Sequence, residues 1–199
     1  EGSGFRGIKL YPPLGYSPSH PVLMDEIYPY CVENDLPVMS HCSRGGVRGR
    51  WIDDREQARL AGPDAFIEVL ETFPRLRVCL AHFGGEAEWD AYLGPPMTTR
   101  RTEDNWLEKI RLMLESGTYP NLYTDISYTV FKYTQNVPAL DIFLSHPRVA
   151  RRVLFGSDFY LTEREGKSER RVSIELRHGI GDAKFRMIAE TNPAEYLGV

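Results

Sequence analysis

The sequence predicts an α/β fold with a parallel sheet or barrel, and three short apolar runs carry this prediction. Each run is bounded by turn-forming residues, as is typical of strands buried on both faces. Each also ends on a residue that binds metals or moves protons. The runs are Pro37–Cys42, Val78–Phe83 and Val153–Phe159, and the end residues are His41, His82 and Asp158. Because chemistry in parallel α/β folds collects at the carboxyl ends of the strands, the sequence predicts a metalloenzyme.

Five segments have the apolar, β-branched character of strands. They are Gly7–Tyr11, Val38–Cys42, Val78–His82, Leu122–Ser127 and Val153–Gly156. Segments with helical patterns follow each of them, so the order is β-α repeated five times. This alternation is the pattern of a parallel sheet in which helices make the crossovers.

The helices are predicted from apolar stripes and from proline and glycine at their ends. The helices expected between strands are Pro21–Asp35, Pro63–Phe73, Asp104–Ser116 and Pro138–Leu144. The tail is expected to be helical over Lys167–Arg177, Asp182–Glu190 and Pro193–Leu197. Pro29 lies inside the first helix and should kink or break it, because proline lacks the N–H that a helix interior needs.

Length and composition indicate a single domain, residues 1–199, with a net charge of −4. That charge does not favour nucleic-acid binding, and no apolar run is long enough to span a membrane. Cys31, Cys42 and Cys79 show no metal-binding spacing, so we expect reduced buried thiols in a cytoplasmic protein. Glu1–Gly4 lacks the character of a signal peptide.

Two long connections follow the strands that end in histidine, Ser43–Gly62 and Gly84–Glu103. Connections of this length are usually functional lids or carry short helices of their own. The first is rich in arginine, which indicates either a solvated basic loop or a site where Arg44 or Arg48 holds an anionic substrate group.

The three strand-end residues suit a metal site. A neutral His41 can donate a lone pair to Zn²⁺, and Asp158 can bind the metal, accept a proton, or do both. His82, before Gly84 and Gly85, is either a second ligand or a general acid/base beside the metal. The structural alternatives are a satisfied core histidine at position 41 and a helix N-cap at position 158.

Lys9 lies in the middle of the first strand, where a barrel-facing cation needs a partner. Lys9 can pair with an acidic neighbour or with a substrate carboxylate. Alternatively, it can be carbamylated and bridge two metals. Tyr11 at the end of that strand joins Lys9, Arg44 and Arg48 as a candidate substrate-binding residue. Asp125 and Ser127 end the fourth strand and are weaker candidates. The remaining histidines are expected to be structural or exposed: His20, His146 and His178.

The ordered series of motifs resembles the amidohydrolase superfamily. The motifs are Gly7–Pro12, Leu36–Cys42, Leu80–Gly84, Leu154–Asp158 and Thr191–Ala194. Each is short, but together they run nearly the whole chain. The branch that the chain resembles most is the amidohydrolase-related group that contains the aminocarboxymuconate-semialdehyde decarboxylase-like enzymes.

This resemblance implies a distorted (β/α)₈ barrel of which the five strands are the fourth to the eighth. It implies metal ligands at His41 and Asp158, and a ligand or catalytic group at His82. The implied cofactor is a divalent metal, Zn²⁺ foremost, with Mn²⁺ or Fe²⁺ as alternatives. It also suggests a homo-oligomer acting on a small-molecule substrate.

One departure from the family pattern is large. The first strand of the family ends in His-x-His or Glu-x-His, and no such motif occurs in these 199 residues. Five strands would leave a barrel open, with exposed edges. We therefore expect an N-terminal part of the same protein to complete the barrel, and a second chain is the alternative.

Three functions are consistent with this sequence. The first is a metal-dependent hydrolase that uses a metal-activated water on an amide, ester or lactone. The second is a metal-dependent, non-oxidative decarboxylase or hydratase of a carboxylated, often aromatic, substrate. The third, which rests only on the missing His-x-His, is a silent scaffold that has lost its metal. The fold alone does not separate them.

Overall fold

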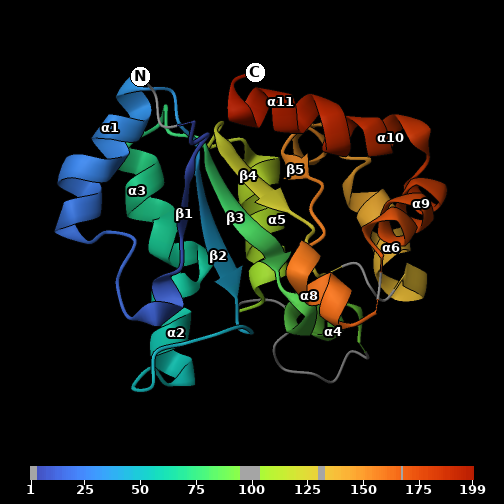
Figure 1. The fold of residues 1–199 in the computed structure, drawn as a ribbon, viewed down its shortest axis with the longest axis horizontal. Helices are drawn as coiled ribbons and strands as arrows, with labels where there is room; N and C mark the ends of the chain where they lie inside the picture. The colour runs from blue at the N-terminus through green and yellow to red at the C-terminus, as the bar shows by residue number, and fades with distance from the viewer. Residues whose placement is uncertain (1–3, 95–103, 130–132, 167) are drawn as a thin grey trace.

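The computed structural model describes residues 4–94, 104–129, 133–166 and 168–199. Its centre is a five-stranded parallel sheet in the order β1-β2-β3-β4-β5 (Figure 1). The strands are β1 Ile8–Leu10, β2 Val38–Ser43, β3 Val78–Gly84, β4 Leu122–Asp125 and β5 Val153–Leu154. The predicted fold class, strand order and parallel pairing are therefore confirmed. Within the described residues β1 and β5 are the two edges and do not pair with each other.

Helices cover one face of the curved sheet (Figure 1). The α-helices are α1 Tyr28–Glu33, α2 Asp54–Ala61, α3 Ile67–Thr72, α4 Glu86–Leu93, α5 Trp106–Ser116, α6 Tyr133–Phe143, α7 Pro147–Ala150, α8 Phe159–Arg164, α9 Glu169–Ile180, α10 Asp182–Arg186 and α11 Asn192–Leu197. The shorter helical segments are η1 Pro12–Leu14, η2 Leu23–Ile27, η3 Pro63–Phe66 and η4 Met187–Thr191. No helix in the described ranges has both the length and the hydropathy that a membrane crossing demands.

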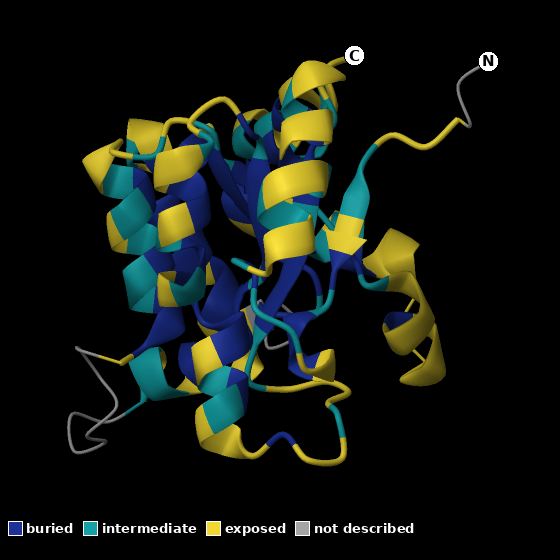
Figure 2. Ribbon diagram, turned by 90° about the vertical axis from the view of Figure 1, so that its left-hand side faces the viewer, coloured by how far each residue is buried: buried dark blue, intermediate teal, exposed yellow. Residues whose placement is uncertain are grey.

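Alternate residues of each strand face two different cores. On β3, Val78 and Leu80 pack into the large core beneath the helices. Cys79 points to the opposite face, where it packs with Tyr123, Leu154 and Tyr196. Figure 2 shows the resulting pattern, with buried strands between helices whose outer sides are exposed. The period of two along a strand thus decides which residues can reach the inner face.

The kink or break predicted at Pro29 takes the form of a π-helical turn that precedes the proline. η2 runs directly into α1, and the Tyr28 N–H bonds to the carbonyl of Leu23, one residue further back than in an α-helix. Pro29 then stands in the first turn of α1, where its missing N–H costs nothing. The single helix predicted over Pro21–Asp35 is therefore a helix whose winding changes before the proline.

Several boundaries differ from the predictions. α6 begins at Tyr133, five residues before the predicted start, because Pro138 is tolerated inside the helix. The first long connection carries α2, and the second carries α4 before residues 95–103, which lie outside the described residues. α9 begins at Glu169; the predicted start at Lys167 also lies outside them.

α11 closes the end of the sheet opposite the site (Figure 1). The buried Asn192 donates from its side chain to the carbonyl oxygens of Ala150 and Val153, both at 2.7 Å. These bonds tie the start of α11 to the start of β5. The predicted helix start at Thr191–Pro193 therefore serves as a buried anchor.

Candidate functional site

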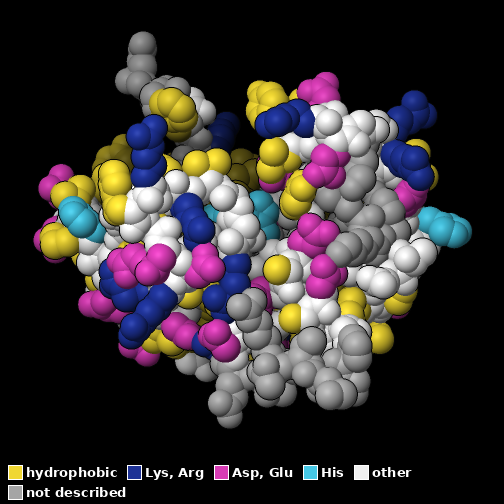
Figure 3. Space-filling model, turned by 90° about the horizontal axis from the view of Figure 1, so that it is seen from below, with side chains coloured by type: hydrophobic (Ala, Val, Ile, Leu, Met, Phe, Trp, Pro, Cys, Tyr) yellow, Lys and Arg dark blue, Asp and Glu magenta, His cyan; other side chains and the backbone are white. Residues whose placement is uncertain are grey.

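A cavity of about 450 Å³ opens at the carboxyl ends of the strands. Its lining includes five of the residues that the sequence singled out: Lys9, Tyr11, His41, His82 and Asp158. Seen from below, the surface is hollowed at its centre and histidine side chains are visible there (Figure 3). An adjoining cavity of about 360 Å³ shares Lys9, His82 and Asp158 with it.

His41 and His82 meet at the centre of this cavity. The Nδ1 atom of His41 lies 3.1 Å from the Nε2 atom of His82, and the two rings meet edge to face. β2 and β3 pair in parallel with His41 opposite Ala81, which places the two histidines at the same level of the sheet. The ring of Tyr11 stacks on the other face of His41, with centroids 4.3 Å apart.

The far nitrogen of each ring contacts a main-chain carbonyl. His41 Nε2 lies 3.0 Å from the oxygen of Gly45, and His82 Nδ1 lies 3.1 Å from the oxygen of Ser127. A carbonyl oxygen can only accept, so each far nitrogen carries a hydrogen. The two facing nitrogens are then lone pairs, which repel each other unless a cation lies between them.

This arrangement fits a pair of metal ligands. Histidines that bind metals donate their other N–H to carbonyls or carboxylates in this way. Burial, with the nearby charges of His82 and Lys9, lowers the pKa of His41 to about 4, so its imidazole is neutral at pH 7 as a ligand must be. Gly46 makes room for the ring, since a Cβ there would lie 3.1 Å from His41.

The structure does not assemble the full predicted ligand set. Among the described residues, no group of three or more His, Cys, Asp or Glu side chains comes together as a metal site. Asp158 lines the cavity at the start of α8 with φ of 54°, and its side chain does not cap that helix. The N-cap alternative is therefore not what holds this carboxylate. The described residues supply two converging nitrogens and a nearby carboxylate.

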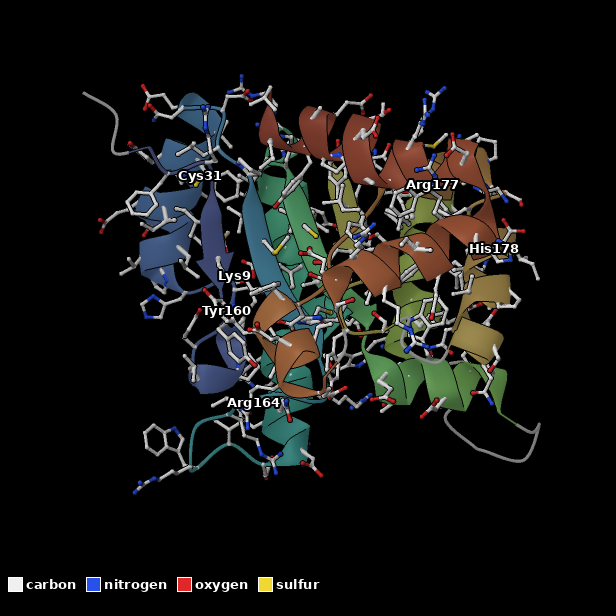
Figure 4. All side chains as sticks on the ribbon, turned by 45° about the vertical axis from the view of Figure 1, so that its right-hand side comes forward. Lys9, Cys31, Tyr160, Arg164, Arg177 and His178 are labelled. Atoms are coloured by element: carbon white, nitrogen blue, oxygen red, sulfur yellow. The ribbon has the colours of Figure 1, made fainter. Side chains whose placement is uncertain are left out.

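Lys9 is the cation of the cavity. Its register partner is Met39, on the inner face of the sheet, and no hydrogen bond or ion pair joins its ammonium to the described residues. Figure 4 shows Lys9 on β1 at the side of the molecule where α8 carries Tyr160 and Arg164. Leu161 of α8 lines the cavity, so the wall beside Lys9 is partly apolar.

The two arginines predicted to bind substrate lie elsewhere. Arg44 donates to the buried carboxylate of Glu88 at 2.7 Å and to Asp104 at 3.0 Å, and it stacks over Trp106. Arg48 pairs with Asp54. Neither lines the cavity. The other histidines are also outside it: His20 and His178 are exposed, and His146 precedes α7.

Two residues that the sequence ranked as weak candidates belong to the site. Asp125 is the last residue of β4 and Ser127 follows it, at the edge of the sheet where His41 and His82 lie near the ends of β2 and β3, and both are buried. Ser127 contacts His82, and Asp125 contacts Ser127. The signal was present as polar residues at the end of a buried strand, but neither residue type alone indicates a role.

The sequence matches the family model described as Amidohydrolase over residues 1–199. No curated protein matches it. One similar structure is a probable 2-pyrone-4,6-dicarboxylic acid hydrolase from Acinetobacter baumannii with citric acid bound, with TM-score 0.63 and 14% identity; the match covers 97% of this chain and 64% of that one.

Two further structures resemble the chain. An amidohydrolase from Burkholderia multivorans with bound zinc has TM-score 0.56 and 12% identity, covering 100% of this chain and 66% of that one. The IDCase of Metarhizium anisopliae in apo form has TM-score 0.54 and 18% identity, covering 97% and 56%. At these identities the likeness concerns the fold, and the chain spans about 64% of the length of the first of these structures.

Proposed function

Because this chain belongs to the amidohydrolase family, we propose that it is the metal-bearing part of a hydrolase that acts on a small carboxylated substrate. The observation that carries the proposal is the pair of facing histidine nitrogens, 3.1 Å apart, in a cavity that also contains the Lys9 ammonium, which no described residue pairs. We place the whole chain, residues 1–199, in one catalytic domain, within the branch that contains the aminocarboxymuconate-semialdehyde decarboxylase-like enzymes.

His41 and His82 would hold a divalent metal, Zn²⁺ foremost, with further donors from Asp158 or from outside the described residues. A bound ion of this kind lowers the pKa of a coordinated water to about 7 and polarises a carbonyl oxygen. The B. multivorans structure contains zinc, which supports this choice of metal. Two protein nitrogens alone fall short of the three protein ligands usual in catalytic zinc sites.

The remaining cavity residues have separate tasks. The carboxylate of Asp158 makes no hydrogen bond or ion pair with the described residues, so it is free to accept a proton from water. The Lys9 ammonium is placed to bind a substrate carboxylate. Tyr11 holds the loop over His41, since its hydroxyl accepts a hydrogen bond from the Val47 N–H at 3.1 Å. The citrate in the A. baumannii structure supports a polyanionic ligand.

A decarboxylase on the same scaffold is the second candidate. The likeness to the IDCase favours it, as does a cavity that combines a cation for a carboxylate with a histidine able to carry a proton. In that reaction His82 would deliver a proton to the carbon that loses CO₂. Cytoplasmic placement and a homo-oligomeric assembly complete the proposal.

The test is a comparison of substrate classes and variants in the zinc-loaded protein. Small carboxylated lactones, esters and amides are assayed for hydrolysis, and hydroxylated aromatic acids are assayed for CO₂ release. We expect hydrolysis that falls at least about 100-fold in Asp158→Asn and His41→Ala, with Lys184→Met on α10 as a matched control. Activity untouched by both substitutions would refute the proposal, and CO₂ release without hydrolysis would select the decarboxylase.

A further inference from the structure

The main chain at His82 is held in a conformation that residues with a Cβ atom rarely adopt. His82 has φ of 71° and Phe83 has φ of 44°, both in the left-handed region. Such residues are strained and persist only where surrounding contacts fix them. One such contact is the hydrogen bond from the His82 N–H to the Oδ1 atom of Asp125, at 3.1 Å.

The same carboxylate oxygen accepts two more hydrogen bonds. The N–H and the hydroxyl of Ser127 both donate to Oδ1 of Asp125, at 2.9 and 2.5 Å. Asp125 is only 4% exposed. Oδ1 of Asp125 is therefore a buried acceptor of three hydrogen bonds at the base of the site.

This carboxylate decides where the hydroxyl hydrogen of Ser127 points. Because that hydrogen goes to Asp125, the Oγ atom turns a lone pair toward His82 Nδ1, 2.9 Å away. The main-chain oxygen of Ser127 also faces Nδ1, at 3.1 Å. With two acceptors around it, Nδ1 must carry the hydrogen, and Nε2 is left as a lone pair.

The opposite tautomer would close the site. If Ser127 donated its hydroxyl to His82 Nδ1, the hydrogen of that ring would lie on Nε2, which faces the Nδ1 lone pair of His41 at 3.1 Å. The two histidines would then hydrogen bond to each other, and neither facing nitrogen would be available to a metal. The direction of the Ser127 hydroxyl hydrogen therefore favours either two histidines whose facing nitrogens can bind a metal or two histidines that hydrogen bond to each other.

We propose that Asp125 is a positioning residue that, by holding the Ser127 hydroxyl hydrogen, acts with the Ser127 carbonyl to favour the Nδ1–H tautomer of His82 and keeps its Nε2 lone pair open for metal or proton. The use of that lone pair rests on the function proposed above. The tautomer itself does not, because it is a property of the protein without substrate or metal.

The test reads the tautomer directly. Two-bond ¹H–¹⁵N spectra of the metal-free protein are recorded at about pH 8, where free imidazole is neutral, and His82 is assigned with His82→Gln. We expect a protonated-type shift at Nδ1 and an unprotonated-type shift at Nε2. In Asp125→Ala part of the hydrogen should move from Nδ1 to Nε2, because the released Ser127 hydroxyl can donate to Nδ1 and then competes with the main-chain oxygen of Ser127, which still accepts there.

Asp125→Asn is the matched variant. All three hydrogen bonds end on Oδ1, which an asparagine oxygen can replace, while its NH₂ would take the place of Oδ2 beside Cys79. We expect Asn to keep the wild-type tautomer and Ala to hold a smaller share of it. An outer partner of this kind is also worth about 10–100-fold in activity, so Ala should reduce kcat by that factor in the zinc-loaded protein.

The wild-type spectrum can overturn the proposal without any variant, by showing the hydrogen on Nε2. An unchanged Nδ1–H tautomer in folded Asp125→Ala would also overturn it. If Asp125→Ala does not fold, the comparison of wild type with Asp125→Asn stands, and an inverted tautomer in the asparagine variant counts against the proposal. A protein with the predicted tautomers but no activity would refute the proposed function and leave this inference standing.

Discussion

The orientation of an individual side chain in this site is set by the groups that contact it on each side. His41 is stacked by Tyr11, bonded to Gly45 and faced by His82, and it is only 5% exposed. The sequence pattern predicted that His41, His82 and Asp158 stand at strand ends, and the structure places them around one cavity. It could not predict the orientation of the rings, because the partner atoms are main-chain oxygens that any residue could supply.

Lys9 gives the first prediction at this scale. Replacing Lys9 with Met keeps the length of the side chain but removes the only lysine or arginine among the described residues that line the cavity. A hydrogen bond to a charged group contributes about 1.5–3 kcal/mol, so we expect KM for a carboxylated substrate to rise about 10–100-fold with a smaller change in kcat. Steady-state kinetics with Lys184→Met as the control will measure it; an unchanged KM in Lys9→Met would show that the ammonium binds no substrate.

The cysteines give the second prediction at the scale of single residues. Cys31, Cys42 and Cys79 are fully buried free thiols, and burial raises the pKa of each. A raised pKa leaves the neutral, unreactive thiol at pH 7–8. We expect no reaction with an aromatic disulfide reagent in the folded protein and three thiols in denaturant. Rapid labelling of any one of them under native conditions would contradict the buried packing.

At the scale of elements, the sheet was predictable and the connections were not. The five strands were found because buried parallel strands read as apolar runs, and their order follows from short β-α connections. Short helices were one alternative for the two long connections, but the positions of α2 and α4 were not predicted and α8 was missed. Their sequences are polar or short, and their positions depend on tertiary contacts. Arg44 illustrates the point, since its basic character suggested a ligand but its partner Glu88 lies far along the chain.

The Arg44–Glu88 pair joins three elements, and this gives the third prediction. Glu88 on α4 is 1% exposed; it accepts from Arg44 after β2 and from the Trp106 N–H at the start of α5, at 2.9 Å. Removing the charge of a buried partner is strongly destabilising, and here Arg44 would keep only the exposed carboxylate of Asp104. We expect Glu88→Gln to lower the free energy of unfolding by about 3 kcal/mol, measured by urea denaturation.

The control for this prediction is the exposed pair Arg59–Glu56 on α2. Solvent screens such pairs, so Glu56→Gln should leave the urea midpoint nearly unchanged. Equal effects of Glu56→Gln and Glu88→Gln would show that the buried pair does not hold the loop, α4 and α5 together.

The whole molecule is part of a barrel. The sheet follows the order of the chain, its inner face carries the site, and the described residues leave β1 and β5 unpaired with each other. The sequence predicted this open arrangement from five strands and from the missing His-x-His motif. Fold class and family membership followed from the order of motifs, whereas the substrate does not, because one barrel serves many reactions.

The histidine pair also sets what the molecule can do with a metal. Two converging nitrogens are provided by β2 and β3, and the described residues hold no group of three donors. A metal bound here must therefore depend on both rings. It must also recruit Asp158 or donors from outside the described residues.

The most direct test of the central claim is the metal content per chain, measured by elemental mass spectrometry after incubation with Zn²⁺ and removal of the excess. We expect close to one zinc ion per chain in the wild type and loss of most of it in both His41→Asn and His82→Asn, with no change in His178→Asn, whose side chain is exposed on α9. A wild type that retains no zinc, or single variants that retain as much as the wild type, would contradict the claim that these two rings form a metal site.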